Sequence, residues 1–139
     1  MTNHVHLLIH SLDLQGMAKF SQLVQRRYAY YYCGSYRWVG NVFQRGYRSL
    51  SVDKDSYLLE CGRYIERNPI KAALARHPAG YPYSSFQYYG CGESDDLLTP
   101  SPAYLALAKS SESRMAVYNE YASEVRLQEE MVEARQLPF

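Results

Sequence analysis

The chain has 139 residues, of which 47% are hydrophobic, and a formal net charge of +1. This is the length and composition of one globular domain, so a multidomain enzyme is excluded. Its hydrophobic runs are shorter than the roughly 18 to 20 residues that span a bilayer, and its N-terminus lacks the pattern of a secretory signal. We therefore expect a cytoplasmic protein with no membrane partner. The three cysteines include no CxxC pair, so we expect free thiols.

The charge is distributed unevenly along the chain. Residues 1–52 carry six Lys or Arg against one Asp, whereas residues 77–139 carry four against nine Asp or Glu. The chain also contains 15 tyrosines. Cations and flat aromatic rings are what a single-stranded nucleic acid requires of its binding surface. A tyrosine-rich core with ordinary solvated arginines is the alternative interpretation.

The first half of the chain predicts a strand, a helix and a second extended segment. Residues 4–10 are short and rich in hydrophobic residues, which is typical of a strand. Hydrophobic residues then recur every three or four positions from about 14 to 32, so we expect a helix capped by Ser11 or Asp13. Residues 42–52 indicate another extended segment, with Gly46 at a bulge.

The second half predicts helices separated by a long loop. Asp53 is a good N-cap for a helix that Pro69 ends or kinks. Residues 77–103 are rich in Pro and Gly, so we expect a connecting loop with little regular structure. From about 102 to 132 the pattern predicts two surface helices, with a break near Ser110 and Ser111.

Two pairs of residues are candidates for chemistry. His4 and His6 lie two apart, so on a strand both imidazoles point to one face and can share a divalent ion. Tyr64 and Asn68 lie four apart, so on a helix a phenol lies one turn from an amide ligand. In the alternative, structural interpretation the histidines are hydrogen-bonded beside a core, Tyr64 is a core aromatic residue and Asn68 ends a helix.

The sequence around these pairs resembles the HUH single-tyrosine transposases, in particular the REP-associated tyrosine transposase group. Residues 1–9 resemble the His-hydrophobic-His strand of that family, and residues 43–49 resemble a later strand. Residues 63–72 follow its Tyr-x-x-x-Asn-Pro-hydrophobic-Lys/Arg-Ala block, and residues 81–86 follow its aromatic-Pro-aromatic-Ser-Ser block. The four blocks occur in the family's order over residues 1–89. The acidic C-terminal part of the chain adds no support to the resemblance.

The resemblance implies an α+β, ferredoxin-like fold and a DNA transposase. Tyr64 would be the nucleophile of single-stranded DNA nicking and strand transfer, through a covalent 5′-phosphotyrosine intermediate. His4, His6 and Asn68 would be the ligands of Mg²⁺ or Mn²⁺. The partner would be single-stranded or hairpin DNA, and monomer and homodimer both stay open. The candidates for DNA contacts are Arg26, Arg27, Arg37, Trp38, Arg45 and Arg48, with Tyr36 as a second stacking ring.

In members of this family a strand, a helix and a second strand precede the His-x-His strand. The given sequence lacks these three elements, so we expect an incomplete sheet followed by C-terminal helices. Residues 1–76 would be the remaining part of the catalytic domain, and residues 77–139 a connecting loop and acidic helices. Three explanations of the incomplete sheet stay open. The start codon is assigned at an internal methionine, the gene is a decayed transposase copy, or the chain forms a dimer that pairs the exposed strands. The alternatives to catalysis are a DNA-hairpin-binding module and an interaction protein without a role on DNA.

Overall fold

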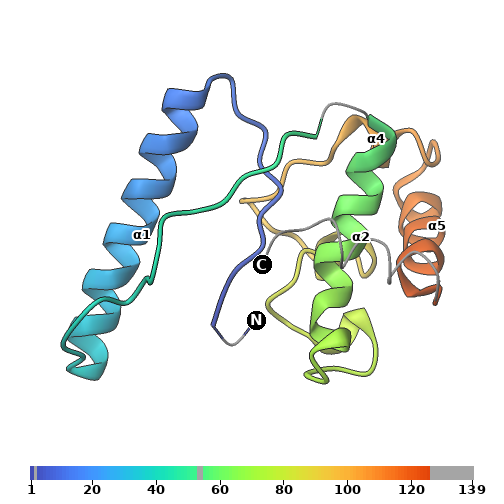
Figure 1. The fold of residues 1–139 in the computed structure, drawn as a ribbon. Helices are drawn as coiled ribbons and strands as arrows, with labels where there is room; N and C mark the ends of the chain where they lie inside the picture. Colours follow the sequence, from blue (N-terminus) through green and yellow to red (C-terminus); the bar gives the residue numbers. More distant parts are fainter. Residues whose placement is uncertain (2, 53–54, 126–139) are drawn as a thin grey trace. The chain divides into compact units, whose positions relative to one another are not determined.

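The computed structural model describes residues 1, 3–52 and 55–125 of the chain. The chain consists of two compact units. The N-terminal unit is Leu8–Ser51, and the core unit is Met1–Leu7 together with the chain from Val52 onward. Among the described residues, no helix has the length and hydrophobicity needed to cross a bilayer. In chain order the helical elements of Figure 1 are α1 (Leu14–Tyr36), α2 (Asp55–Lys71), η1 (Pro78–Gly80), α3 (Phe86–Tyr89), α4 (Pro102–Leu105) and α5 (Ser111–Ser123).

The predicted ferredoxin-like α+β fold is wrong, because the described part of the chain is helical and contains no strand. Residues 4–10 and 42–52, which the pattern favours as strands, belong to no sheet. A strand persists only where a neighbouring strand pairs with its backbone N–H and C=O groups. Residues 4–10 form no regular element, and the boundary between the two units falls within them, after Leu7.

The first predicted helix is confirmed, and α1 extends four residues further than the predicted end, to Tyr36. Of the two predicted caps, Asp13 accepts a hydrogen bond from the backbone N–H of Gly16. This bond satisfies one of the first N–H groups of the helix, which have no partner within the helix itself. The helix ends at Arg37, whose backbone is left-handed with φ 52°.

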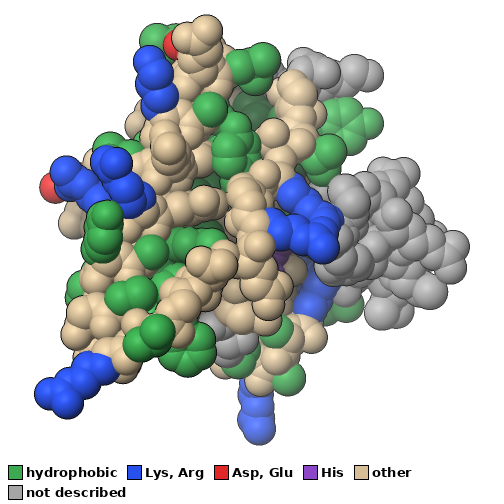
Figure 2. Space-filling view, turned by 60° about the vertical axis from the view of Figure 1, so that its left-hand side comes forward, with side chains coloured by type: hydrophobic (Ala, Val, Ile, Leu, Met, Phe, Trp, Pro, Cys, Tyr) green, Lys and Arg blue, Asp and Glu red, His purple; other side chains and the backbone are tan. Residues whose placement is uncertain are grey.

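An aromatic stripe follows α1 at four-residue spacing in the N-terminal unit. The rings of Tyr32 and Tyr36 have centroids 4.7 Å apart, and Tyr28 lies 6.0 Å from Tyr32. The segment after the helix packs on the same stripe, with Phe43 5.8 Å from Tyr28 and Trp38 6.3 Å from Tyr32. These contacts leave many hydrophobic side chains of the unit exposed. Figure 2 shows one face of the chain, on which Lys and Arg side chains stand beside hydrophobic ones.

The core unit is built around α2, which packs against η1, α4 and α5. Its hydrophobic core consists of Phe86, Tyr104, Tyr118 and Ala122.

The break near Ser110 is confirmed, because the Ser110 side chain caps α5 by accepting from the N–H of Ser113. The two predicted surface helices instead contribute core residues, and the predicted loop 77–103 contains η1 and α3. The part of the predicted tail after residue 125, and the predicted cap Asp53, lie outside the described residues.

Two arginines of α2 bind the C-terminal end of α5. Arg63, which is 2% exposed, donates to the carbonyl oxygens of Tyr121 and Glu124. Arg67 donates to those of Ala122 and Ser123, each at 3.1 Å. The last four carbonyls of a helix have no partner within the helix, and the helix dipole concentrates negative charge there. Cations from a different helix therefore complete α5 and attach it to α2.

The helix α2 continues two residues past Pro69 and ends at Lys71. The end is a Schellman motif, in which the N–H of Leu74 donates to the carbonyl of Pro69 and the N–H of Ala73 to that of Ile70. Ala73 occupies the left-handed position of this motif with φ 55°. Glycine is the usual residue there, because a Cβ is unfavourable in left-handed backbone.

Replacing Ala73 by glycine is expected to stabilise the chain by about 0.5 to 1 kcal/mol, since it removes this conflict at the end of α2. Urea unfolding followed by circular dichroism measures the change. Ala72→Gly, one residue earlier, is the matched control and is expected to destabilise by a similar amount. Destabilisation by both variants would show that the left-handed residue carries no strain.

Candidate functional site

The core unit brings the predicted histidine pair to the predicted nucleophile. The rings of His4 and His6 lie edge to face with centroids 4.9 Å apart, although the segment is not a strand. His6 in turn lies edge to face against the ring of Tyr64 on α2, with centroids 5.8 Å apart. His6 and Tyr64 are half-buried, and His4 is exposed. Three rings from two distant parts of the sequence therefore form one contiguous cluster.

The two histidines have different surroundings. Nδ1 of the exposed His4 is 2.7 Å from Oδ1 of the preceding residue, Asn3, whereas His6 is half-buried. Burial lowers the pKa of His6, and the positive charges of His4 and of the amino terminus lower it further. A lowered pKa favours the neutral imidazole, which is the form that binds a metal.

Asn68 lies one turn after Tyr64 on α2 and is 8% exposed. Its side-chain Nδ2 donates to the carbonyl oxygen of Tyr64 at 2.9 Å. The next residue, Pro69, has no N–H and its ring crowds the carbonyl of Ile65, so this bond reinforces the helix where proline weakens it. The amide nitrogen is thereby occupied, and Oδ1 is the atom of Asn68 that suits an ion.

The distance between the two imidazole rings is compatible with one shared divalent ion. An ion about 2.1 Å from one nitrogen of each ring places the two centroids about 4.5 to 5.2 Å apart, for bond angles from about 90° to 109°. The observed 4.9 Å falls in this range. In the described part of the chain no group of three or more His, Cys, Asp or Glu is placed to hold an ion. The donors that the sequence indicated are two imidazole nitrogens and one amide oxygen, and nitrogen ligands suit Mn²⁺ better than Mg²⁺.

Lys71 reaches this cluster, and Tyr81 contacts the first residue of the chain. The ammonium group of Lys71, the last residue of α2, lies 4.8 Å from the centroid of the Tyr64 ring. The phenol oxygen of Tyr81 accepts a hydrogen bond from the Met1 amino group at 2.9 Å. The first residues of the chain are thus near the segment 81–86 as well as near α2. Neither Lys71 nor Tyr81 was predicted as a site residue, although Lys71 is seven positions after Tyr64 and so shares its helix face.

A buried carboxyl joins two of the sequence blocks that carry the family resemblance. Glu66 on α2 is fully buried and accepts hydrogen bonds from Ser85 Oγ at 2.7 Å and from the Tyr118 hydroxyl at 2.8 Å. Burial raises the pKa of Glu66 to about 7, although these two hydrogen bonds act to lower it. The sequence did not indicate this residue, because helical spacing alone does not distinguish a buried Glu from a solvated one.

The predicted DNA-contact residues all belong to the N-terminal unit. Arg26 and Arg27 are exposed on α1, and Arg37 is the exposed residue that ends that helix. Trp38 is about half exposed while one edge packs on Tyr32, and Tyr36 is more exposed still. Arg45 and Arg48 follow in the exposed segment after the helix. The unit thus combines exposed cations with partly exposed rings.

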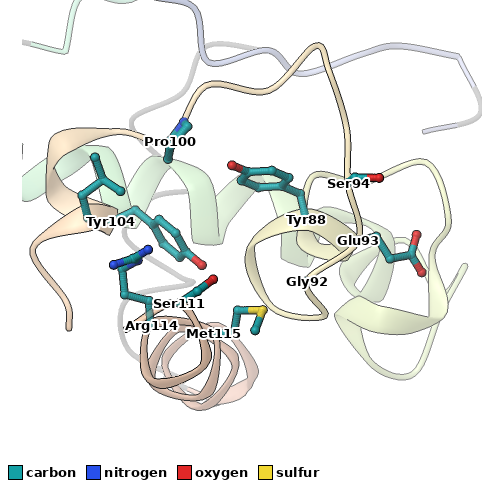
Figure 3. A pocket seen from close by; sticks show the side chains of 10 residues that line it. Tyr88, Gly92, Glu93, Ser94, Pro100, Tyr104, Ser111, Arg114 and Met115 are labelled. Carbon is teal, nitrogen blue, oxygen red and sulfur yellow. The ribbon is translucent and has the colours of Figure 1, made fainter. Parts of the chain in front are cut away.

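A separate pocket of about 220 Å³ lies between α3, α4 and α5 (Figure 3). Tyr88, Tyr104 and Met115 line it, and Arg114 lies at its edge with Nη1 donating to the carbonyls of Ala108 and Lys109. None of the lining residues belongs to the cluster around Tyr64. The chemistry that Tyr64 and the histidines could perform therefore does not involve this pocket.

Comparisons of the chain with family models, with curated proteins and with solved structures found no match. The function therefore has to be inferred from the residues and from their geometry.

Proposed function

We propose that this chain nicks single-stranded DNA and transfers the strand through a covalent 5′-phosphotyrosine link to Tyr64. The observation that carries the proposal is the contact of the His6 ring with the Tyr64 ring, with His4 against His6. The sequence pairs His4/His6 and Tyr64/Asn68 are each compatible with a structural role. A nucleophile in contact with a pair of imidazoles, with a buried amide one helical turn along α2, offers the groups that metal-assisted phosphoryl transfer uses.

In the proposed reaction the phenol oxygen of Tyr64 forms a bond to the scissile phosphorus. The bond from phosphorus to the 3′-oxygen of the preceding nucleotide breaks, and the phenol proton is transferred to that oxygen, which leaves as a 3′-hydroxyl. Because the phosphotyrosine link retains the energy of the phosphodiester bond, a 3′-hydroxyl can later attack it and rejoin the strand. No external energy source is needed.

His4, His6 and Oδ1 of Asn68 would hold the divalent ion of this reaction. When bound, Mn²⁺ or Mg²⁺ supplies positive charge that neutralises the scissile phosphate. The protein's own contribution is orientation: the edge of His6 packs on the Tyr64 ring and limits its rotation. We expect Mn²⁺ to support the reaction better than Mg²⁺, because imidazole nitrogens suit Mn²⁺ better than Mg²⁺.

The DNA would contact the exposed arginines of the N-terminal unit through its phosphates, and Tyr36 and Trp38 would stack on unpaired bases. These side chains follow one another closely along α1 and the segment after it. Such an enzyme would act in the cytoplasm, at the nucleoid.

The experiment uses the full chain and a pool of 3′-labelled oligonucleotides, each with a hairpin and a randomised single-stranded flank. The 3′ label stays with the DNA fragment that carries the 5′-phosphotyrosine link. In Mn²⁺ we expect a protein–DNA adduct that survives denaturing electrophoresis, and none after chelation. Absence of an adduct from the whole pool, or equal amounts with and without chelator, would overturn the proposal.

Replacing His6 by alanine is expected to reduce the rate of adduct formation at least 100-fold, because it removes one metal ligand and the ring that orients Tyr64. The rate is measured in a single turnover with saturating Mn²⁺. His10→Ala, which removes an exposed imidazole from the N-terminal unit, is the matched control and should keep the original rate. Equal rates for the His6 and His10 variants would show that the histidine cluster has no part in the reaction.

A second candidate function is binding of hairpin-flanked DNA without catalysis. The observation that favours it is the concentration of six Lys or Arg against Asp13 in residues 1–52, beside the aromatic stripe of α1. Binding that weakens steeply with salt, together with no adduct in any metal, would support this function over the first.

A further inference from the structure

The ring of Tyr64 lies between an imidazole and an ammonium group. His6 contacts the ring edge to face, and Nζ of Lys71 lies 4.8 Å from the ring centroid. Lys71 is exposed, and among the described residues the Tyr64 ring is the partner that the structure shows for its ammonium group. A lysine in this position is a positive charge that can reach any group bound to the phenol oxygen.

The position of Lys71 is determined by α2 and not by a loop. Lys71 follows Tyr64 by seven residues, which is about two helical turns, so both side chains project from one face. The Schellman motif after Lys71 satisfies the carbonyls of Pro69 and Ile70. The negative end of the helix dipole also favours a cation there. The ammonium group is therefore held beside the phenol before any substrate arrives.

On the basis of the proposed function, we infer that Lys71 binds a non-bridging oxygen of the scissile phosphate while Tyr64 attacks it. Negative charge increases on these oxygens as the phenol oxygen bonds to phosphorus and the 3′-oxygen leaves. The flexible four-carbon stem allows the ammonium group to move from the ring face to the phosphate, where an N⁺–H···O⁻ bond forms. Lys71 acts through its charge and takes no part in proton transfer.

A purely structural role is the competing explanation, because an ammonium group over an aromatic ring is by itself a stabilising contact. The two explanations differ in the step at which the positive charge of Lys71 has its effect. A structural contact would act on folding or on the position of Tyr64 before the reaction, whereas a phosphate contact acts mainly on the rate of the chemical step.

The test measures single-turnover adduct formation with saturating oligonucleotide from the same 3′-labelled pool, in Mn²⁺. Lys71→Met retains the stem without the charge, and its rate is expected to be about 100-fold lower, the loss typical of one oriented donor to a transition state. Lys71→Arg retains a cation and should stay within about 10-fold of the unaltered chain. Lys109→Met, which removes an exposed lysine elsewhere in the core unit, should leave the rate unchanged.

DNA binding before the reaction is measured separately in chains that also carry Tyr64→Phe. Adding Lys71→Met to that chain is expected to change Kd by less than about threefold, and the melting temperature should stay within a few degrees. A Lys71→Met chain that reacts at the original rate would overturn the inference on Lys71 and leave the proposed function intact. Equal losses in Lys71→Met and Lys71→Arg would also overturn it, since the charge would not be what matters. No adduct from the unaltered chain would overturn both.

Discussion

Replacing Tyr64 by phenylalanine is expected to abolish the covalent protein–DNA adduct. The substitution removes one oxygen atom and retains the ring, so the edge-to-face contact with His6 and the contact with Lys71 can both persist. Without the phenol oxygen no bond to phosphorus can form. Binding of the oligonucleotides should change by less than about threefold, because the arginines of the N-terminal unit are unaltered.

The adduct is measured by denaturing electrophoresis of the 3′-labelled DNA, and binding by a mobility shift. Tyr57→Phe is the matched control: Tyr57 is an exposed tyrosine two turns before Tyr64 on the same helix, and its variant should form adduct at the original rate. If Tyr64→Phe formed as much adduct as Tyr57→Phe, the nucleophile would be another residue and the cluster would have a structural role.

The stability of the chain is expected to fall by about 2.5 kcal/mol between pH 5 and pH 8 through Glu66 alone. Burial raises the pKa of Glu66 from 4.5 to about 7 in the folded chain. The folded state therefore binds the proton more tightly than the unfolded state does. The resulting stabilisation is complete below about pH 4.5 and is lost as the pH rises through about 7.

The groups around Glu66 explain why ionisation is costly there. Ser85 and Tyr118 donate to its two oxygens, which partly compensates the charged form, but the carboxyl is fully buried between α2, α3 and α5. The ionised carboxylate in turn raises the pKa of Tyr118, in addition to the larger effect of burial. A hydrogen-bonded carboxyl that is protonated at low pH avoids the cost of desolvating a charge.

Urea unfolding at pH 5, 6, 7 and 8 measures the effect. Glu66→Gln keeps the shape of the side chain without the titration. Between pH 5 and pH 8 the free energy of unfolding of this variant should therefore fall by about 2.5 kcal/mol less than that of the unaltered chain. Glu120→Gln, which changes an exposed carboxyl on α5, should follow the unaltered chain. Identical curves for the unaltered chain and Glu66→Gln would contradict the raised pKa.

Local patterns in the sequence were sufficient to predict the longer helices. The spacing of hydrophobic residues and the cap at Asp13 predicted α1, and Ser110 correctly separated α4 from α5. Each of these signals acts between residues a few positions apart, so it is present in the sequence itself. Residues 4–10 and 42–52 carry an equally local strand signal, but a strand also needs a partner strand, which no local pattern supplies.

The sequence by itself determined which residues are candidates for chemistry, namely His4, His6, Tyr64 and Asn68, because motif spacing is a local property. Only the tertiary structure decided that His6 lies against Tyr64, that Arg63 and Arg67 complete the end of α5, and that Glu66 is buried. Each of these facts depends on residues distant in the sequence that packing brings together. The free energies of burial and of unpaired polar groups select such contacts over the whole core unit, and no short stretch of sequence contains that information.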